Sequence, residues 1–265
     1  MRDENIGQIN LIKQQRPNLF KRILTGETVL VPPIPSDIPI VGAKNIVGTD
    51  RPPTMFFASP ILSEKGVVLA VIAERFDPHA DFSRITRLGR IGDKGETYAF
   101  DHQAKLLSES YFVNELIAPG LLKAGDQDIL SLEIRDPGRD LSKDSTPMTR
   151  AGDFPLTKMA QQATRGINGF NMSGYRNYRG IPVVGVWMWD DSLGFGMASE
   201  VDVNSALDAY YIARLAVIVI LTITVSVSII FTLLTMVVGS RANRSLKRAH
   251  DELEDRVSLR TKELS

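Results

Sequence analysis

The chain has 265 residues, with 31 basic and 31 acidic side chains and a formal net charge of zero. This balance leaves no excess of positive charge for a polyanion, so we expect no nucleic-acid partner. The sequence contains no cysteine, which excludes disulfide bonds, thiol catalysis and cysteine-ligated metal sites.

The N-terminal part alternates between helical and extended patterns. Residues 8–24 carry helical apolar spacing interrupted by Pro17, which predicts one broken helix or two short helices. The segment from Val29 to Pro53 is rich in proline and is expected to form loop or edge structure. Thr54–Leu62 and Val67–Ala73 flank a polar turn ending in glycine, so we predict an antiparallel hairpin. The second run is so continuously apolar that we do not expect it at a sheet edge.

A second group of elements begins near residue 95. Glu96–Phe100 and Leu106–Ser110 flank a polar turn and predict another hairpin. Asp153 is expected to cap a helix that stops at Gly166.

Two further strands lead into a long helix. Ile181–Trp189 and Phe195–Val201 are predicted strands, and strand alternation places Trp187 and Trp189 on the same face. The last strand runs almost directly into Asn204–Asp208, where we expect a membrane helix to begin. A shift in that strand would then reach the helix with little slack.

The run from Leu215 to Val238 contains no charged residue. At about 1.5 Å per residue it exceeds the ~30 Å hydrocarbon layer, which predicts one tilted transmembrane helix. A buried core helix is the alternative. Basic residues gather after the run (Arg241, Arg244, Lys247 and Arg248), and only Arg214 lies close before it. Because basic flanks stay in the cytoplasm, we expect a single-pass protein of the inner (cytoplasmic) membrane, with residues 1–210 periplasmic or extracellular and a cytoplasmic C-terminus.

The residues at both ends indicate that the chain is a fragment of a longer receptor. The first residues have neither the basic region nor the apolar core of a signal peptide, although insertion by the internal helix alone is an alternative. The last residues, Arg256 to Ser265, remain in helical register.

The residues after the membrane segment show the four- and three-residue spacing of a short coiled coil. Its seam would contain Leu246, His250, Leu253, Val257, Arg260 and Leu264. This predicts a parallel homodimer joined through a cytoplasmic helix, residues 241–265.

Several motifs occur in a recognisable order between residues 54 and 210. They are Gly95–Asp101, Leu106–Ser110, Leu132–Gly138, Pro155–Ala160, Gly174–Trp187, Leu193–Gly196 and Glu200–Asp202. Together they resemble the membrane-proximal module of double Cache sensor domains, which are extracytoplasmic PAS-like modules of bacterial receptors.

The resemblance implies a fold class and a division of the chain. We expect an α/β (α+β) PAS-like fold with an antiparallel sheet. Residues 83–205 would form the membrane-proximal Cache module, and residues 1–82 part of the membrane-distal one. Residues 206–240 would hold the transmembrane helix with its flanks. One departure is the central turn, where the family has a glycine after aspartate and this chain has Gln103 and Ala104.

The tail carries a second resemblance. Leu253–Leu264 is similar to the signalling helix that joins membrane sensors to histidine kinase cores. This implies small-molecule sensing outside the membrane by the input half of a sensor histidine kinase, whose missing output domain would contact a response regulator. The input region of a nucleotide or diguanylate cyclase is one alternative, and a membrane-anchored periplasmic binding or scaffold protein is another. His250 begins a stretch like the phosphoacceptor box, but no proline follows, so we expect no phosphotransfer there.

The sequence predicts no catalytic, metal or cofactor site. His79 and His102 stand alone in predicted loops without metal-ligand spacing. No glycine-rich phosphate loop or nucleophile elbow is present.

Aromatic and basic residues of the proximal module are candidates for ligand binding. They are Tyr98, Tyr175, Arg176, Tyr178 and Trp187. In this hypothesis Arg176 meets a carboxylate and the aromatic side chains cover an apolar part of the ligand. The alternative is that the aromatic side chains pack in the core. Distal candidates are Arg51, Phe57 and Asp77.

Overall fold

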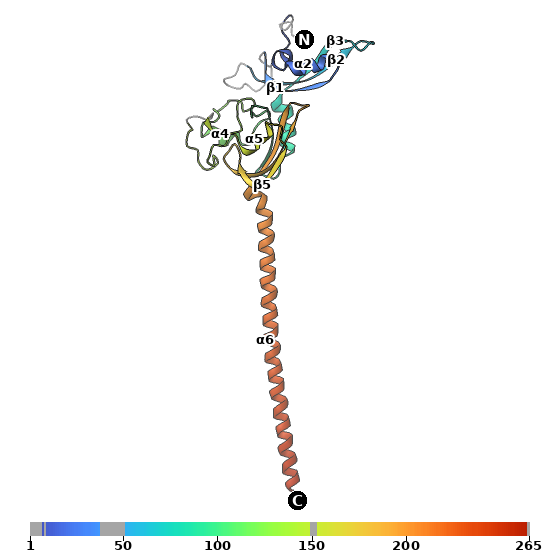
Figure 1. The fold of residues 1–265 in the computed structure, drawn as a ribbon. Helices are drawn as coiled ribbons and strands as arrows, with labels where there is room; N and C mark the ends of the chain where they lie inside the picture. Colours follow the sequence, from blue (N-terminus) through green and yellow to red (C-terminus); the bar gives the residue numbers. More distant parts are fainter. Residues whose placement is uncertain (1–6, 8, 38–50, 149–152, 264–265) are drawn as a thin grey trace. The chain divides into compact units, whose positions relative to one another are not determined.

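The computed structural model describes residue 7 and residues 9–37, 51–148 and 153–263. The chain divides into two compact units, Met1–Ala206 and Leu207–Ser265. The first unit holds two antiparallel sheets and several short helices, whereas the second belongs to one long helix (Figure 1). This composition confirms the predicted α/β class with antiparallel sheets.

The first sheet has three antiparallel strands in the order β1 (Val29–Pro35), β2 (Pro53–Leu62) and β3 (Val68–Phe76). β2 and β3 are the predicted hairpin, and β1 is an edge strand within the proline-rich segment. Helices α1 (Leu11–Gln15) and α2 (Pro17–Leu24) precede the sheet. The predicted break falls between them because proline is favoured in the first turn of a helix and disfavoured in its interior.

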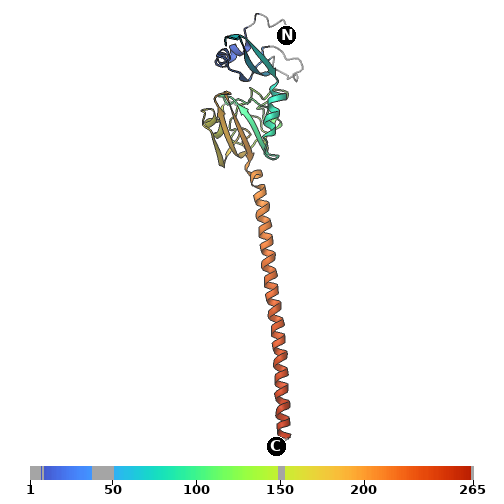
Figure 2. The ribbon, with the colours of Figure 1, turned by 90° about the vertical axis from the view of Figure 1, so that its right-hand side faces the viewer.

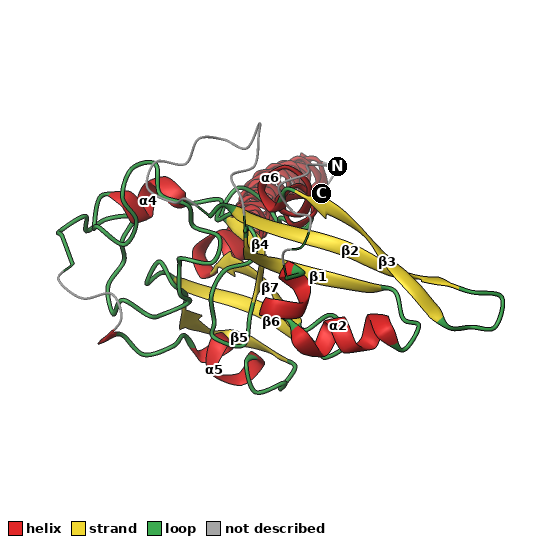
Figure 3. Cartoon of the chain, turned by 90° about the horizontal axis from the view of Figure 1, so that it is seen from above, coloured by secondary structure: helices red, strands yellow, loops and turns green. Residues whose placement is uncertain are grey.

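A small apolar core joins these helices to the sheet. α2 lies against the strands (Figure 3), and Ile23 is fully buried. The core consists of Leu11, Ile12, Ile23, Val29, Val31, Ile34, Phe56 and Ala58.

β3 does not occupy the expected place. It pairs only with β2 in the described residues and is therefore an edge strand, contrary to the prediction. Leu69 and Ile72 are 68% and 61% exposed. A continuous apolar run usually indicates a strand covered on both faces, but in the described part nothing covers these two side chains.

A short helical link joins the two sheets. It consists of the π-helix η2 (Pro78–Phe82) and helix α3 (Ser83–Leu88). Phe82 packs edge-to-face on Phe195, with ring centroids 5.6 Å apart. These rings belong to a cluster that also contains Met55, Ala99 and Leu107, so the link is surrounded by apolar contacts. The predicted module boundary at residue 82 stays a prediction.

The second sheet has four antiparallel strands in the order β4, β7, β6 and β5. Their bounds are β4 (Gly95–Phe100), β5 (Gly169–Arg176), β6 (Pro182–Asp190) and β7 (Phe195–Asp202). β4, β6 and β7 confirm three predicted strands, whereas β5 was not predicted. Leu106 makes only an isolated bridge to Phe100, so the expected strand Leu106–Ser110 is not formed.

The main core lies on one face of this sheet. Helices α4 (Val113–Ile117) and α5 (Lys158–Ala163) lie on that side (Figure 1). Trp187 and Trp189 share one face, as predicted, and both point into this core, while Met188 is exposed on the opposite face.

The helix cap predicted at Asp153 is wrong. α5 begins after Thr157, whose hydroxyl accepts a hydrogen bond from the Ala160 backbone N–H at 3.2 Å. Thr157 is a good cap residue that comes four positions later. Gly166 follows the helix in a left-handed conformation, as expected for a stop signal.

The turn after β4 forms without the glycine that the family has after aspartate. Ala104 adopts a φ of 59°, a left-handed conformation that glycine usually occupies. Asp101 holds the turn, because its carboxylate accepts hydrogen bonds from the backbone N–H groups of Gln103 and Lys105. Ala104 is fully buried in the main core, so its methyl group contributes apolar contacts there.

One helix, α6 (Val203–Glu263), occupies the rest of the described residues. Its segment Val203–Val257 is the one helix in the described residues that is long and apolar enough to cross a membrane. Hydroxyl groups within the apolar run donate to backbone carbonyls one turn earlier, for example Thr222 to Ile218 and Thr224 to Ile220, each at 2.8 Å. Such bonds satisfy hydroxyl groups in an environment without water.

Four of the predicted seam residues lie on the exposed surface of α6. Leu246, Leu253 and Val257 are exposed apolar side chains, and His250 forms a 3.7 Å pair with Glu254. Leu264 lies outside the described residues. The coiled coil and the homodimer stay predictions.

Candidate functional site

Two glutamates face each other inside the apolar core of the four-stranded sheet. Glu96 on β4 pairs directly with Glu200 on β7, and Glu200 is also opposite Gly185 on β6. Glu96 has the same strand parity as Tyr98 and therefore points to the core face. The two glutamates are 4% and 2% exposed. A pair of carboxyl groups is therefore removed from solvent at the centre of the module.

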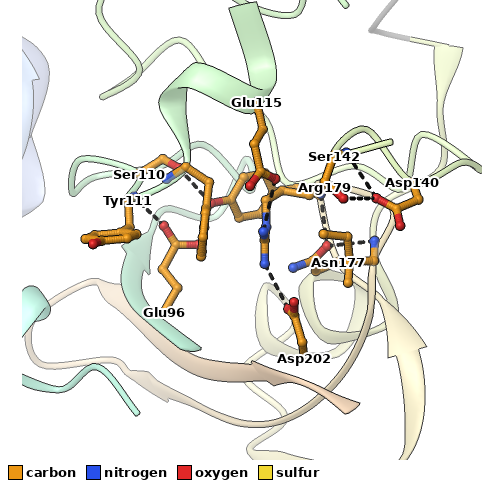
Figure 4. A network of polar contacts seen from close by, with 12 residues as sticks. Glu96, Ser110, Tyr111, Glu115, Asp140, Ser142, Asn177, Arg179 and Asp202 are labelled. Carbon is orange, nitrogen blue, oxygen red and sulfur yellow. Dashed lines mark hydrogen bonds and ion pairs between the residues drawn. The ribbon is translucent and has the colours of Figure 1, made fainter. Parts of the chain in front are cut away.

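Glu96 is fully hydrogen-bonded (Figure 4). Its Oε1 accepts the backbone N–H of Tyr111 at 2.6 Å, and its Oε2 accepts the hydroxyl of Tyr178. Ser110 forms a further hydroxyl contact of 2.8 Å with Tyr178. Burial raises the pKa of the Glu96 carboxyl above its usual value, against the lowering effect of these hydrogen bonds.

Glu200 has an incomplete set of partners. Its Oε1 accepts the Tyr175 hydroxyl at 2.5 Å. Its Oε2 and the hydroxyl of Tyr98 are buried with no hydrogen-bond partner among the described residues. Burial raises the pKa of Glu200 to about 7, although the neighbouring hydroxyls of Tyr175 and Tyr98 lower it.

Gly185 makes room for the Tyr175–Glu200 contact. A Cβ atom at this position would lie 2.7 Å from the Tyr175 hydroxyl and 2.9 Å from Glu200 Cγ. The lack of a side chain on β6 therefore lets Tyr175, on β5, reach across to β7.

Arg179 connects the core to the end of β7. Its guanidinium is 3.1 Å from Glu115 on α4 and 3.0 Å from Asp202, the last residue of β7 (Figure 4). It also lies over the ring of Phe112, 3.5 Å from the centroid. Arg179 is 2% exposed, so these charge-assisted contacts are largely shielded from water.

The turn that carries Arg179 is tightly held. Asn177 accepts hydrogen bonds from the backbone N–H groups of Arg179 and Ile181 through its side-chain oxygen. Gly180 has a φ of 73°, and a Cβ there would lie 1.7 Å from the carbonyl oxygen of Arg139. This close approach requires glycine and fixes the direction of the arginine.

The structure brings together four of the five predicted proximal residues. Tyr98, Tyr175, Tyr178 and Trp187 are buried in one cluster. Arg176 is exposed and does not join them, whereas Arg179, three residues later, does. The turn after β5 reverses the chain between the two arginines, so only Arg179 points toward the aromatic cluster. Whether these residues bind a ligand stays a prediction.

The distal candidates are not brought together. Phe57 is half exposed and packs on Phe76, Asp77 caps η2 through the His79 backbone N–H, and Arg51 is exposed. The neighbouring Phe56 instead lines a cavity of about 210 Å³ on the other face, beside the ion pair of Arg75 and Asp37. A shift of one residue along a strand exchanges the two faces.

A second cavity lies next to the polar network. It has a volume of about 150 Å³ and is lined in part by Tyr178, Arg135 and Glu133. Arg135 is already engaged there, with Glu133 at 2.5 Å and with the carbonyl of Phe154 at 2.6 Å. The described residues contain no group of three or more acidic, histidine or cysteine side chains that could hold a metal ion.

Sequence reasoning missed Glu96, Glu200 and Arg179 as site residues. The signal was present for both glutamates, because each has the parity of core positions in its own strand. Glu96 alternates with Tyr98 and Phe100, and Glu200 alternates with Ala198. The structure shows which face of each strand is buried and so places both glutamates on the core face.

No family model matches the chain. No curated protein matches it either. Solved structures do match. The extracellular domain mmHK1S-Z3, assigned to a histidine kinase, is 14% identical, with a TM-score of 0.40, over 74% of this chain and 55% of that one.

Two chemoreceptor domains match at a similar level. The ligand-binding domain of Pseudomonas aeruginosa PctB, solved with L-Arg, is 14% identical, with a TM-score of 0.40, over 79% of this chain and 63% of that one. The periplasmic sensory domain of Campylobacter jejuni Tlp1 is 15% identical, with a TM-score of 0.39, over 77% and 59%. The chain therefore spans less than two thirds of these domains. Their names describe an extracellular domain, a ligand-binding domain and a periplasmic sensory domain.

Proposed function

We propose that the chain senses an extracytoplasmic stimulus and transmits it through the membrane. The observation that supports this most is the junction of β7 and α6. β7 ends at Asp202 and α6 begins at Val203, so no loop separates the sheet from the helix (Figure 2). A rigid strand that continues into a helix passes on a displacement that a flexible loop would absorb.

The polar network supplies a means of moving this junction. Arg179 forms one ion pair with Asp202 at the end of β7 and another with Glu115 on α4. A stimulus that changes the position of α4, or the charge of the core, therefore acts on the last residue before the helix. Because Arg179 is buried, loss of one partner is costly, and the arrangement favours two discrete states over gradual deformation.

For the output we propose a histidine kinase core that acts on a response regulator. The resemblance of Leu253–Leu264 to signalling helices supports this assignment. Two chains would associate in parallel along the seam that starts at Leu246. A cyclase output would use a related helix, and the parent gene beyond Ser265 distinguishes the two.

The proposal requires the sheets and the C-terminus to lie on opposite sides of a membrane. The absence of native cysteine permits a clean labelling test. Glu64→Cys places a thiol on the exposed β2–β3 turn, and Asn243→Cys places one after the apolar run. In intact cells a membrane-impermeant maleimide should label position 64 and leave position 243 unlabelled. After permeabilisation both positions should react.

The opposite labelling pattern would contradict the orientation. Labelling of both positions in intact cells would contradict membrane insertion itself. Native gel mobility and melting temperature of each variant in detergent, compared with the unsubstituted chain, check that folding is retained.

A further inference from the structure

The Glu96–Glu200 pair, if both carboxyls were ionised, would carry more negative charge than its surroundings neutralise. Arg179 is the basic group that acts on both carboxyls. Its guanidinium, however, is already engaged by Glu115 and Asp202. Two ionised carboxylates at directly paired, buried strand positions repel each other, and this repulsion favours a proton on one of them.

The hydrogen bonds indicate which carboxyl holds the proton. Both oxygens of Glu96 accept hydrogen bonds, from the Tyr111 N–H and the Tyr178 hydroxyl, and these bonds favour its ionised form. Glu200 accepts one hydrogen bond from Tyr175, and its Oε2 has no partner in the described part of the chain. The buried Tyr98 hydroxyl is a neighbouring group that is also unpartnered there. Protonated Glu200 can donate from Oε2 to the Tyr98 oxygen, and ionised Glu200 can accept the Tyr98 hydroxyl, so this pair accommodates both protonation states.

We infer that Glu200 is a proton-binding site and that the proton is a stimulus of this module. The proton enters an existing hydrogen-bonded cluster, and the chain needs no larger cavity to accept it. Its role as a stimulus rests on the proposed sensory function, whereas proton binding itself does not. The titratable and charged groups that act on Glu200 and its network come from β4, β5, the β5–β6 turn, α4 and β7: Glu96, Tyr98, Tyr175, Tyr178, Arg179, Glu115 and Asp202.

Burial of the Glu200 carboxyl determines the pH range over which it binds and releases the proton. Burial raises the pKa of Glu200 to about 7, the hydroxyls of Tyr175 and Tyr98 lower it, and the charge of Glu96 raises it. The site thus changes charge between mildly acidic and neutral conditions. Loss of the proton places a second negative charge beside Glu96, and Arg179, whose charge acts on both carboxyls, forms an ion pair with Asp202.

Infrared difference spectroscopy of the full chain in detergent micelles tests proton binding directly. A step from pH 8 to pH 5 should produce the C=O band of a buried protonated carboxyl, with a midpoint near pH 7 and a shift in D₂O. Glu200→Gln should abolish this band. Glu64→Gln, which alters an exposed glutamate, should retain it.

A second variant keeps the test decisive if Glu200→Gln fails to fold. Tyr175→Phe removes the hydroxyl that stabilises the ionised carboxyl, so the midpoint should rise by about one pH unit. A midpoint that stays the same or falls would contradict the assignment to Glu200.

Thermal stability provides an independent readout. Because the folded-state pKa lies above the ordinary value of 4.5, the folded chain holds the proton more tightly than the unfolded chain between these values. This contribution to stability is complete below about pH 4.5 and is lost as the pH rises through about 7. The melting temperature should therefore fall more steeply between pH 5 and pH 8 in the wild type than in Glu200→Gln.

Equal slopes in the two proteins, or a carboxyl band that persists in Glu200→Gln, would overturn the proposal. A negative result in the infrared or melting-temperature test would not affect the cysteine labelling result. Failure of the proton-binding inference is therefore distinguishable from failure of the proposed function. If the band titrates as expected but reporter output does not change between pH 8 and pH 5, the proton binds without being a stimulus, and that part of the inference is wrong.

Discussion

Arg179 is the residue through which the core and the start of α6 are connected. It contacts the carboxylates of Glu115 and Asp202 and the ring of Phe112, and it is almost completely buried. Its contribution is electrostatic and structural together, because a planar guanidinium can satisfy two carboxylates and an aromatic face at once.

Replacement of Arg179 by methionine should lower the free energy of unfolding by about 3 kcal/mol. The substitution keeps much of the side-chain volume but leaves two partly buried carboxylates without their cation. Arg176→Met is the matched control, since this exposed arginine lies three residues earlier, and it should change stability by less than about 0.5 kcal/mol. Denaturant unfolding of the full chain in detergent measures both. Equal effects of the two variants would show that Arg179 does not have this role.

The residue scale also shows the limit of sequence reasoning. Alternation correctly placed Trp187 and Trp189 on the same face of their strand, and the structure shows that this face is the core face. It could not choose between Arg176 and Arg179, because the turn after β5 ends the alternation and tertiary contacts decide which side chain turns inward. Alternation also could not decide which face of β2 borders a cavity. Phe57 lies on the exposed face, whereas Phe56 lines the cavity beside Arg75 and Asp37.

At the scale of elements, the predicted strands are mostly present and their neighbours are not always those expected. The hairpin of β2 and β3 was confirmed because turn residues and β-branched runs act locally. The place of β3 at the edge was missed because strand order depends on contacts far apart in sequence. β5 was missed because its inward positions include Asn171, so its pattern lacks regular apolar alternation.

The continuity of α6 leads to a prediction about helical phase. Deletion of Asn243 from the chain joined to its proposed output domain should rotate all later residues by about 100° relative to the apolar segment. Deletion of residues 239–245 removes one heptad and changes the phase by only about 20°. In a reporter assay the first variant should lose or invert regulation, and the second should retain it.

Expression of both phase variants is checked by immunoblot of membranes. Regulated output from the single-residue deletion, at wild-type amplitude, would contradict a phase-dependent relay through the helix. Loss of regulation in both variants at normal expression would show that helix length matters more than phase.

At the scale of the whole molecule, each unit has a distinct physical character. Met1–Ala206 buries one face of each sheet in apolar clusters, whereas the apolar surface of the helix in the second unit is exposed among the described residues. The sequence predicted the long apolar helix because the run from Leu215 to Val238 contains no charged residue. It did not reveal the carboxyl pair, because Glu96 and Glu200 are far apart in the chain and become neighbours only through the pairing of β4 and β7.

The central claim is that a change in the core network reaches the membrane helix through the junction of Asp202 and Val203. The most direct measurement is reporter output from Asp202→Asn in two backgrounds, one with the native junction and one with Gly-Ser-Gly inserted between these residues. With the native junction, Asp202→Asn should change basal output severalfold, because it removes one partner of Arg179. With the insertion, the same substitution should have no effect, because the flexible segment uncouples strand from helix. An equal change in both backgrounds, or no change with the native junction, would contradict the account.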